Sequence, residues 1–134
     1  MVASAAVLLA AVGAGEAAAP GSALAAPEAQ NAKTIRLVLT VAKGESTKPA
    51  QRRASLTCQP AGGSHRQART ACQQLAKVGG RIDKLQSDGS MCIMLWDPVT
   101  VTANGTWKGR KVAYTHTFSN ACTLGTTTGS VFSL

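Results

Sequence analysis

The chain has 134 residues with 14 Lys and Arg against six Asp and Glu, which gives a formal net charge of +8. This length corresponds to one domain plus a removable segment. The positive charge is compatible with nucleic acids or anionic surfaces as partners. However, the basic residues are scattered and aromatic residues make up only 4% of the chain. Nucleic acid is therefore not an expected partner.

The N-terminal segment has features of a secretion signal. An apolar run from Ala5 to Val12 is followed by small residues that end in Ala23-Leu24-Ala25, an Ala-x-Ala cleavage pattern. The run is too short to span a bilayer, and no other stretch predicts a membrane span. We therefore expect a secretory signal peptide over residues 1–25, a flexible tail over 26–33, a domain over 34–134 and an extracellular location. The absence of a basic residue before Lys33 departs from the usual signal pattern.

Two strands and a helix are predicted in the first half of the domain. Alternating apolar and polar residues predict strands over Ile35–Val41 and Arg53–Cys58. Ser64 is a candidate N-cap for a helix from His65 to Lys77, in which apolar residues recur at helical spacing. A brief second helical turn is predicted over residues 82–85.

The C-terminal third predicts a hairpin and a last strand. The hairpin strands are Val99–Ala103 and Val112–Phe118. Either Asn104-Gly105 forms the turn, or Lys108-Gly109-Arg110 does and Asn104-Gly105 is a bulge. The tail from Ser130 to Leu134 predicts a short final strand. Together, these elements predict an α+β domain in which helix covers one face of an antiparallel sheet of about five strands.

An even number of cysteines indicates disulfides in a secreted chain. Four cysteines allow three pairings, and the local solution is Cys58–Cys72 with Cys92–Cys122. Each bridge would stabilise the fold by roughly 3–4 kcal/mol in the chain-entropy model. A zinc site is disfavoured because there is no Cys-x-x-Cys and no histidine at ligand spacing. No metal is expected.

One cysteine lies in a run of large apolar residues that ends at a proline, Met91-Cys92-Ile93-Met94-Leu95-Trp96-Asp97-Pro98. If exposed, such residues mark an interaction site, and a disulfide beside them would hold the segment rigid. A buried strand is the alternative interpretation.

Nothing in the sequence indicates an enzyme. The acidic residues are isolated, and there is no Gly-x-Ser-x-Gly, P-loop or dinucleotide motif. Neither a catalytic residue nor a cofactor is predicted.

Several separate motifs, in the right order from about residue 35 to the end, resemble the Streptomyces subtilisin inhibitor family. Before the apolar run these are Cys58-Gln59-Pro60, Gly63-Ser64-His65, Ala71-Cys72 with Leu75, and Val78-Gly79-Gly80. The run Met91–Pro98 resembles the reactive-site loop of that family. After it come Phe118-Ser119-Asn120-Ala121-Cys122 and Gly129-Ser130-Val131-Phe132.

The resemblance implies a five-stranded antiparallel sheet with two short helices on one face, two disulfides, and a homodimer formed through the sheet. It also implies reversible standard-mechanism inhibition of subtilisin-like serine proteases, with chymotrypsin-like enzymes as secondary targets. By alignment, the reactive bond is Met94–Leu95. The contact loop would add Met91, Cys92, Ile93 and Trp96, and we expect Asn120 to brace this loop.

The chain departs from the family pattern at three positions, and one of them lies in the loop. The family commonly has Pro where this chain has Ile93, and Pro stiffens a loop by fixing φ. The other two, Arg66 and Gln73, lie in the predicted helix.

A different function also fits the charge, namely a cationic extracellular binding module for anionic polymers or the cell envelope.

Overall fold

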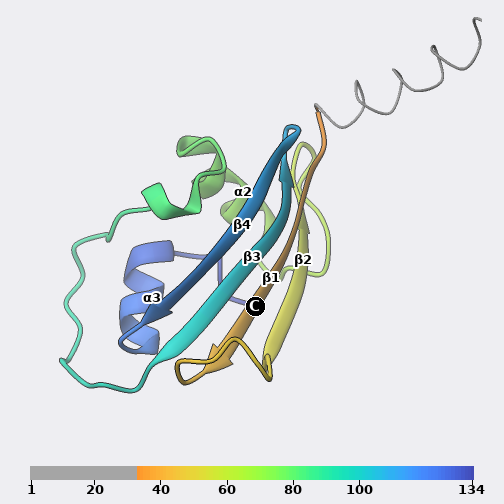
Figure 1. The fold of residues 1–134 in the computed structure, drawn as a ribbon. Coiled ribbons are helices and arrows are strands. Elements are labelled where there is room, and N and C mark those ends of the chain that lie inside the picture. Colours follow the sequence, from red (N-terminus) through yellow and green to blue (C-terminus); the bar gives the residue numbers. More distant parts are fainter. Residues whose placement is uncertain (1–32) are drawn as a thin grey trace, which may run out of the picture.

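The computed structural model describes residues 33–134. Residues 1–32, which include the expected signal peptide and nearly all of the expected tail, lie outside the described residues. The described part forms a four-stranded antiparallel sheet in the order β2-β1-β3-β4 (Figure 1). Its strands are β1 (Ile35–Lys43), β2 (Arg52–Thr57), β3 (Val99–Trp107) and β4 (Arg110–Phe118).

The alternation of apolar residues gives the sheet one buried face. Leu37 and Leu39 of β1 and Val101 and Ala103 of β3 are fully buried, because side chains at every second position point to the same side. The helices α2 (Ala68–Lys77) and α3 (Ala121–Thr128) lie on one side of the sheet (Figure 1). The core therefore lies between this face and the helices.

The hairpin of β3 and β4 turns at Lys108-Gly109, the second of the two predicted positions. Both residues have positive φ values, 48° and 85°, as a two-residue hairpin turn requires. Asn104-Gly105 is not a bulge, because the pairing of β3 with both neighbours continues through it without a break. Gly105 is needed there, since an added Cβ would lie 1.9 Å from the Arg36 carbonyl oxygen.

The first helix begins later than the sequence predicts. The structure starts α2 at Ala68, with Gln67 as the N-cap residue. The prediction of Ser64 as N-cap is wrong, because its hydroxyl accepts a hydrogen bond from the Ser55 backbone N–H at 2.9 Å. His65 is buried instead, and its Nδ1 accepts from the Gln67 N–H while its Nε2 lies 2.8 Å from the Val131 carbonyl oxygen.

The second α-helix lies where none was predicted. The turn predicted at residues 82–85 is a single 3₁₀ turn, η1 (Ile82–Lys84). The helix α3 was missed because its Thr- and Gly-rich sequence has low helix propensity. It is specified by its N-cap, since the Asn120 side chain accepts a hydrogen bond from the Thr123 N–H.

The predicted fifth strand does not form. The tail after α3 is buried at Val131, Phe132 and Leu134, but it pairs with no strand. Its backbone makes turns instead, because the Val131 N–H donates to Thr128 and the Ser133 N–H donates to Ser130. A short apolar run is buried equally well in either form, so its pattern alone did not distinguish them.

Both disulfides take the local pairing. Cys58–Cys72 joins the end of β2 to α2, and Cys92–Cys122 joins the apolar run to α3. None of the helices in the described residues is long and apolar enough to cross a membrane.

Candidate functional site

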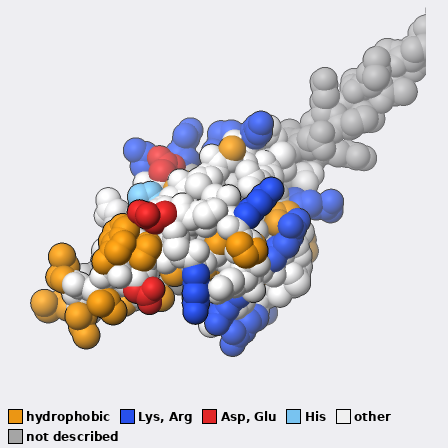
Figure 2. Space-filling view, turned by 60° about the horizontal axis from the view of Figure 1, so that its bottom comes forward, with side chains coloured by type: hydrophobic (Ala, Val, Ile, Leu, Met, Phe, Trp, Pro, Cys, Tyr) orange, Lys and Arg blue, Asp and Glu red, His pale blue; other side chains and the backbone are white. Residues whose placement is uncertain are grey.

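The run Met91–Trp96 forms an exposed loop with no regular secondary structure. Met94 is 99% exposed and Met91 94% exposed, and Ile93, Trp96 and Leu95 also lie in solvent. Hydrophobic side chains accordingly gather at one projecting end of the molecule (Figure 2). The interpretation of this run as a buried strand is excluded, and a patch of this kind marks a binding surface.

Backbone hydrogen bonds fix both the turn of the loop and its return to the sheet. The Leu95 N–H donates to the Ile93 carbonyl at 2.9 Å, which bends the chain around Met94. The Asp97 N–H donates to the Ser119 carbonyl at 2.9 Å, and the Gly44 N–H donates to the Pro98 carbonyl at 2.7 Å. The downstream end of the loop is thus tied to the end of β1 and to the segment between β4 and α3.

Asn120 connects the loop to the body of the protein. Its Nδ2 donates to the Leu95 carbonyl at 2.9 Å and to the Ile93 carbonyl at 3.2 Å. Its Oδ1 accepts from the Thr123 N–H at 2.8 Å and from the Thr123 hydroxyl at 3.0 Å. The side chain is 8% exposed and uses both ends of its amide, so one residue caps α3 and holds the two carbonyls that flank Met94 along the chain.

The disulfide Cys92–Cys122 fixes the same loop at a second point. Cys92 lies two residues before Met94, and Cys122 lies in the first turn of α3. The helix α3 therefore carries both the covalent and the hydrogen-bonded support of the loop. Cys58–Cys72 lies in another part of the fold and does not touch the loop.

A tight turn lies at the upstream end of the loop. The Asp88 carboxylate accepts a hydrogen bond from the Ser90 N–H at 2.8 Å. Hydrogen bonds from the side chain and backbone of Ser90 lower the pKa of Asp88 from its usual value. The Asp88 N–H donates to the Thr126 carbonyl, so this turn is also held by α3.

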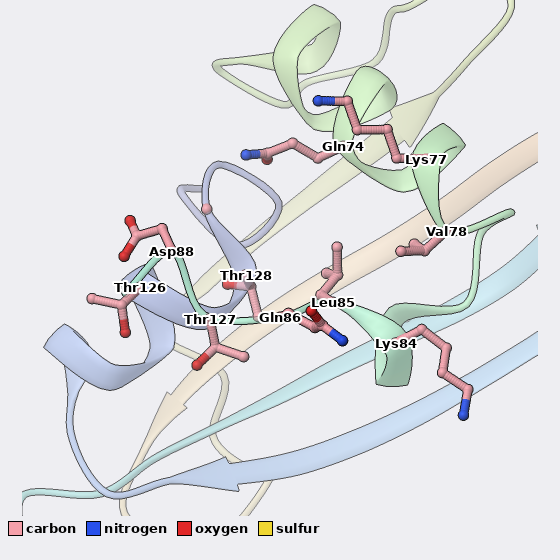
Figure 3. A pocket seen from close by; sticks show the side chains of 11 residues that line it. Gln74, Lys77, Val78, Lys84, Leu85, Gln86, Asp88, Thr126, Thr127 and Thr128 are labelled. Atoms are coloured by element: carbon pink, nitrogen blue, oxygen red, sulfur yellow. The ribbon is translucent and has the colours of Figure 1, made fainter. Parts of the chain in front are cut away.

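A cavity of about 420 Å³ lies between α2, η1 and α3, and its lining extends to Asp88 at the upstream end of the loop. Its lining mixes two lysines, one aspartate and several threonines, and Figure 3 shows Lys84 extending away from Gln74 and the threonines. The charged groups do not converge on one point. Among residues 33–134, no group of His, Cys, Asp or Glu could hold a metal ion.

Sequence reasoning found the residues that project from the loop but missed several of the groups that hold it. The residues missed are Gly44, Ser119 and Thr123, which hold the loop base or orient Asn120. The only signal in the sequence was an Asn with Thr three positions later, which is the pattern of a helix N-cap.

Comparison with known proteins identifies a family for this chain. The family model described as "Subtilisin inhibitor-like" matches residues 33–120. The chain belongs to the subtilisin inhibitor-like family. It is 48% identical over 101 residues to subtilisin inhibitor-like protein 5 of Streptomyces fradiae, which covers 72% of this chain and 94% of that protein. It is 44% identical over 119 residues to the subtilisin inhibitor of Streptomyces albogriseolus, covering 86% of this chain and 80% of that protein.

A solved structure of a family member was determined with a protease. Streptomyces caespitosus sermetstatin in complex with Bacillus licheniformis subtilisin matches this fold with a TM-score of 0.63 and 34% identity. The match covers 74% of this chain and 97% of that chain. This chain, with its four-stranded antiparallel sheet, two α-helices and two disulfides, thus has a structural match in a protein solved in complex with subtilisin.

Proposed function

We propose that this chain is a secreted inhibitor of subtilisin-like serine proteases and not an enzyme. The observation that carries the proposal is a fully exposed Met94 on a loop that a disulfide and a buried asparagine hold in one shape. The named activity of the relatives and the subtilisin bound to the structural neighbour support it.

In this proposal, the loop enters the protease as a substrate strand, with Met94–Leu95 at the scissile position. Extended segments bind proteases through backbone hydrogen bonds, while pockets for the side chains supply specificity. Met94 is unbranched and flexible, so it suits a large apolar S1 pocket. Met91 would fill a second apolar pocket upstream, and Ile93, Leu95 and Trp96 would complete the contact.

The supports of the loop explain why such a segment would inhibit and not be consumed. A loop whose motion is already restricted loses less conformational entropy on binding than a free segment does. After cleavage of Met94–Leu95, Cys92–Cys122 would hold the upstream end and Asn120 the downstream end. The new amine would stay close to the acyl group, so resynthesis would compete with hydrolysis.

Ile93 replaces the proline that is common at this place in the family, and its surroundings offer a substitute constraint. The Ile93 carbonyl accepts hydrogen bonds from both the Leu95 N–H and the Asn120 amide. A β-branched side chain also restricts χ1. We infer that these contacts supply much of the stiffness that proline would give.

Titration of subtilisin with the purified protein tests the proposal directly. We expect activity on a peptide substrate to fall linearly to near zero at one inhibitor chain per enzyme. Chymotrypsin, whose S1 pocket is also apolar, should be inhibited more weakly. Rapid digestion of the protein with no loss of subtilisin activity would contradict the proposal.

We also propose that the protein forms a homodimer through the sheet face that the helices leave uncovered. This face carries Val38, Thr40, Thr102 and Ala113, and its hydroxyls pair with one another across the strands, as in Thr40–Thr102. The exposed cations Arg36, Arg53 and Lys111 share this face, and each is the second residue of its strand. A second copy would therefore cover the small central side chains and leave these cations near the edges of the contact.

A further inference from the structure

A second cavity, of about 460 Å³, lies on the helix-covered side of the sheet where the strands run past the helices. Its walls come from the end of β1, the start of β2, the segment before α2, the first turns of α3 and the C-terminal tail. This volume is in the range of small-molecule sites. The cavity does not include the side chains of the protease-binding loop.

Strand alternation explains why basic side chains surround this cavity. Val41 and Lys43 follow Leu37 and Leu39 at every second position of β1, so they lie on the same face of the sheet. Arg52 lies opposite Val41 on β2 and shares that face. Lys43 and Arg52 thus continue the core-facing rows of β1 and β2 but are exposed cations, while Val41 and Val99 beside them are half-buried and buried.

The cavity has an apolar floor and a basic rim. The floor is formed by the side chains of Val41, Val99, Leu124 and Phe132, which are buried or half-buried. The rim carries Lys43, Arg52 and Arg66 together with the amides of Gln51 and Gln67. No Asp or Glu is among the described residues that line it.

From this arrangement we propose that the cavity binds a small amphiphilic anion, a carboxylate, sulfate or sulfonate attached to an apolar body. The apolar residues of the cavity would exclude water from the apolar part of the ligand. The guanidinium groups of Arg52 and Arg66 would bind its anionic group with charge-assisted hydrogen bonds. A polymer or a protein would not fit in a space of this size. Ala121 lines the cavity between Asn120 and Cys122, so the ligand would lie against the helix that supports the loop.

Gly125 offers a way to close the cavity without disturbing its surroundings. It lies in α3, lines the cavity, and an added Cβ would meet nothing within 4 Å. Gly125→Phe should therefore fill the space with its ring while keeping helical backbone geometry. Gly125→Leu is a smaller variant for the same purpose.

The probe for the experiment is anilinonaphthalene sulfonate, followed by fluorescence on the folded protein, with decanoate as competitor. We expect saturable binding that decanoate displaces and decanol does not. Arg52→Glu/Arg66→Glu should weaken binding at least about tenfold, because it replaces two charge-assisted contacts by repulsion. Gly125→Phe should abolish binding, and Gly125→Leu should weaken it.

A matched variant distinguishes probe binding at the cavity from a general effect of the net charge of the protein. Arg69→Glu/Arg81→Glu makes the same charge change at exposed positions outside the cavity. It should bind the probe as the wild type does. An equal loss in this variant, unaltered binding in both Gly125 variants, or equal displacement by decanol would overturn the proposal. Circular dichroism and subtilisin titration of every variant show that the fold and the protease-binding loop are intact.

Discussion

Met94 and Met91 are the same residue type in nearly the same exposure, yet the proposed mechanism gives them different tasks. Met94 lies at the bend that the Leu95–Ile93 hydrogen bond creates, and Asn120 holds the residues on both sides of it. Met91 lies before the disulfide anchor Cys92. Only Met94 therefore sits where the backbone is held on both flanks, and this difference can be tested.

Met94→Lys should shift inhibition from subtilisin towards trypsin. A lysine ammonium would contact the aspartate at the bottom of the trypsin S1 pocket, while a methionine side chain would not pair with that carboxylate. Inhibition constants against the two enzymes measure the shift. Met91→Lys is the matched control, since it adds the same charge at an equally exposed position, and it should leave trypsin uninhibited. If the Met91 variant acquires trypsin inhibition instead, the assignment of the scissile bond is wrong.

Asn120→Asp separates the two roles of Asn120. Aspartate keeps the acceptor for Thr123 but loses the donors to Ile93 and Leu95, and its charge would repel their carbonyls. Losing two such bonds should weaken subtilisin binding by about 1–3 kcal/mol, which is roughly fivefold to 150-fold. Thermal stability should also fall, because a nearly buried carboxylate then faces two carbonyl oxygens without a donor.

Asn120→Ala removes the helix cap as well and should lower the free energy of unfolding by ~1 kcal/mol. Chemical denaturation measures the free energy of unfolding, and timed digestion with subtilisin measures how fast the loop is cleaved. If the wild type, Asn120→Asp and Asn120→Ala inhibit subtilisin equally, Asn120 only caps α3.

At the scale of elements, α3 is the support on which the loop depends. It holds the loop through Cys122, through its N-cap Asn120, and through the Thr126 carbonyl that receives the Asp88 N–H. The helix is short and rich in Thr and Gly, so packing and capping must maintain it, not propensity. Its inner side is anchored by the buried side chains of Leu124 and Thr128.

Replacing Cys92 and Cys122 by Ser should turn the inhibitor into a substrate. Without the bridge, the loop samples more shapes, and the ends produced by cleavage at Met94–Leu95 separate before resynthesis. Mass spectrometry of timed digests should show fast cleavage at that bond and inhibition that fades. The wild type should be cut slowly and remain inhibitory.

The other disulfide provides the control. Replacing Cys58 and Cys72 by Ser should also reduce the free energy of unfolding by about 2–4 kcal/mol. Because this bridge lies away from the loop, the folded fraction should still inhibit durably. If both double variants behave alike, the loop bridge acts only through global stability.

The whole molecule presents two different surfaces, an apolar loop at one end (Figure 2) and a sheet face that the helices leave uncovered (Figure 1). The uncovered face is built by the even-numbered residues of β1 and β3, of which Val38, Thr40 and Thr102 are half-buried. Such a face could bind a second copy while the loop stays free. Dimerisation and inhibition would then be independent.

Val38→Glu should weaken the proposed dimer, because Val38 lies on a central strand of the uncovered face and pairs with both Ser55 and Asn104. A charge placed there twice by symmetry should raise the dissociation constant at least about tenfold. Analytical ultracentrifugation measures this, with subtilisin titration expected to be unchanged. Gln73→Glu on α2 adds the same charge outside that face and should leave the dimer intact. A monomeric wild-type protein would contradict the dimer.

Local patterns determined much of this structure. Alternation in Ile35–Val41 and Val112–Phe118 was sufficient to place strands, because the two faces of a strand differ in burial. The cysteine spacing favoured the local disulfide pairs. The run Met91–Pro98 by itself allowed either an exposed loop or a buried strand, and the resemblance to the inhibitor family favoured the loop. The helix ending at Lys77 was also evident, although its start was placed three residues early.

Other features depended on contacts between distant segments. The tail at Val131–Leu134 reads as a strand but fills the core in turns, because its hydrogen bonds go to its own neighbours. The helix α3 has weak propensity and exists because Asn120 caps it and Leu124 is buried. Asn120 reaches the loop across 25 residues of sequence, and Arg52 and Arg66 meet at one cavity only after β2 and α2 have packed. Periodicity encodes which side of an element is buried, but only the folded chain decides which element lies against it.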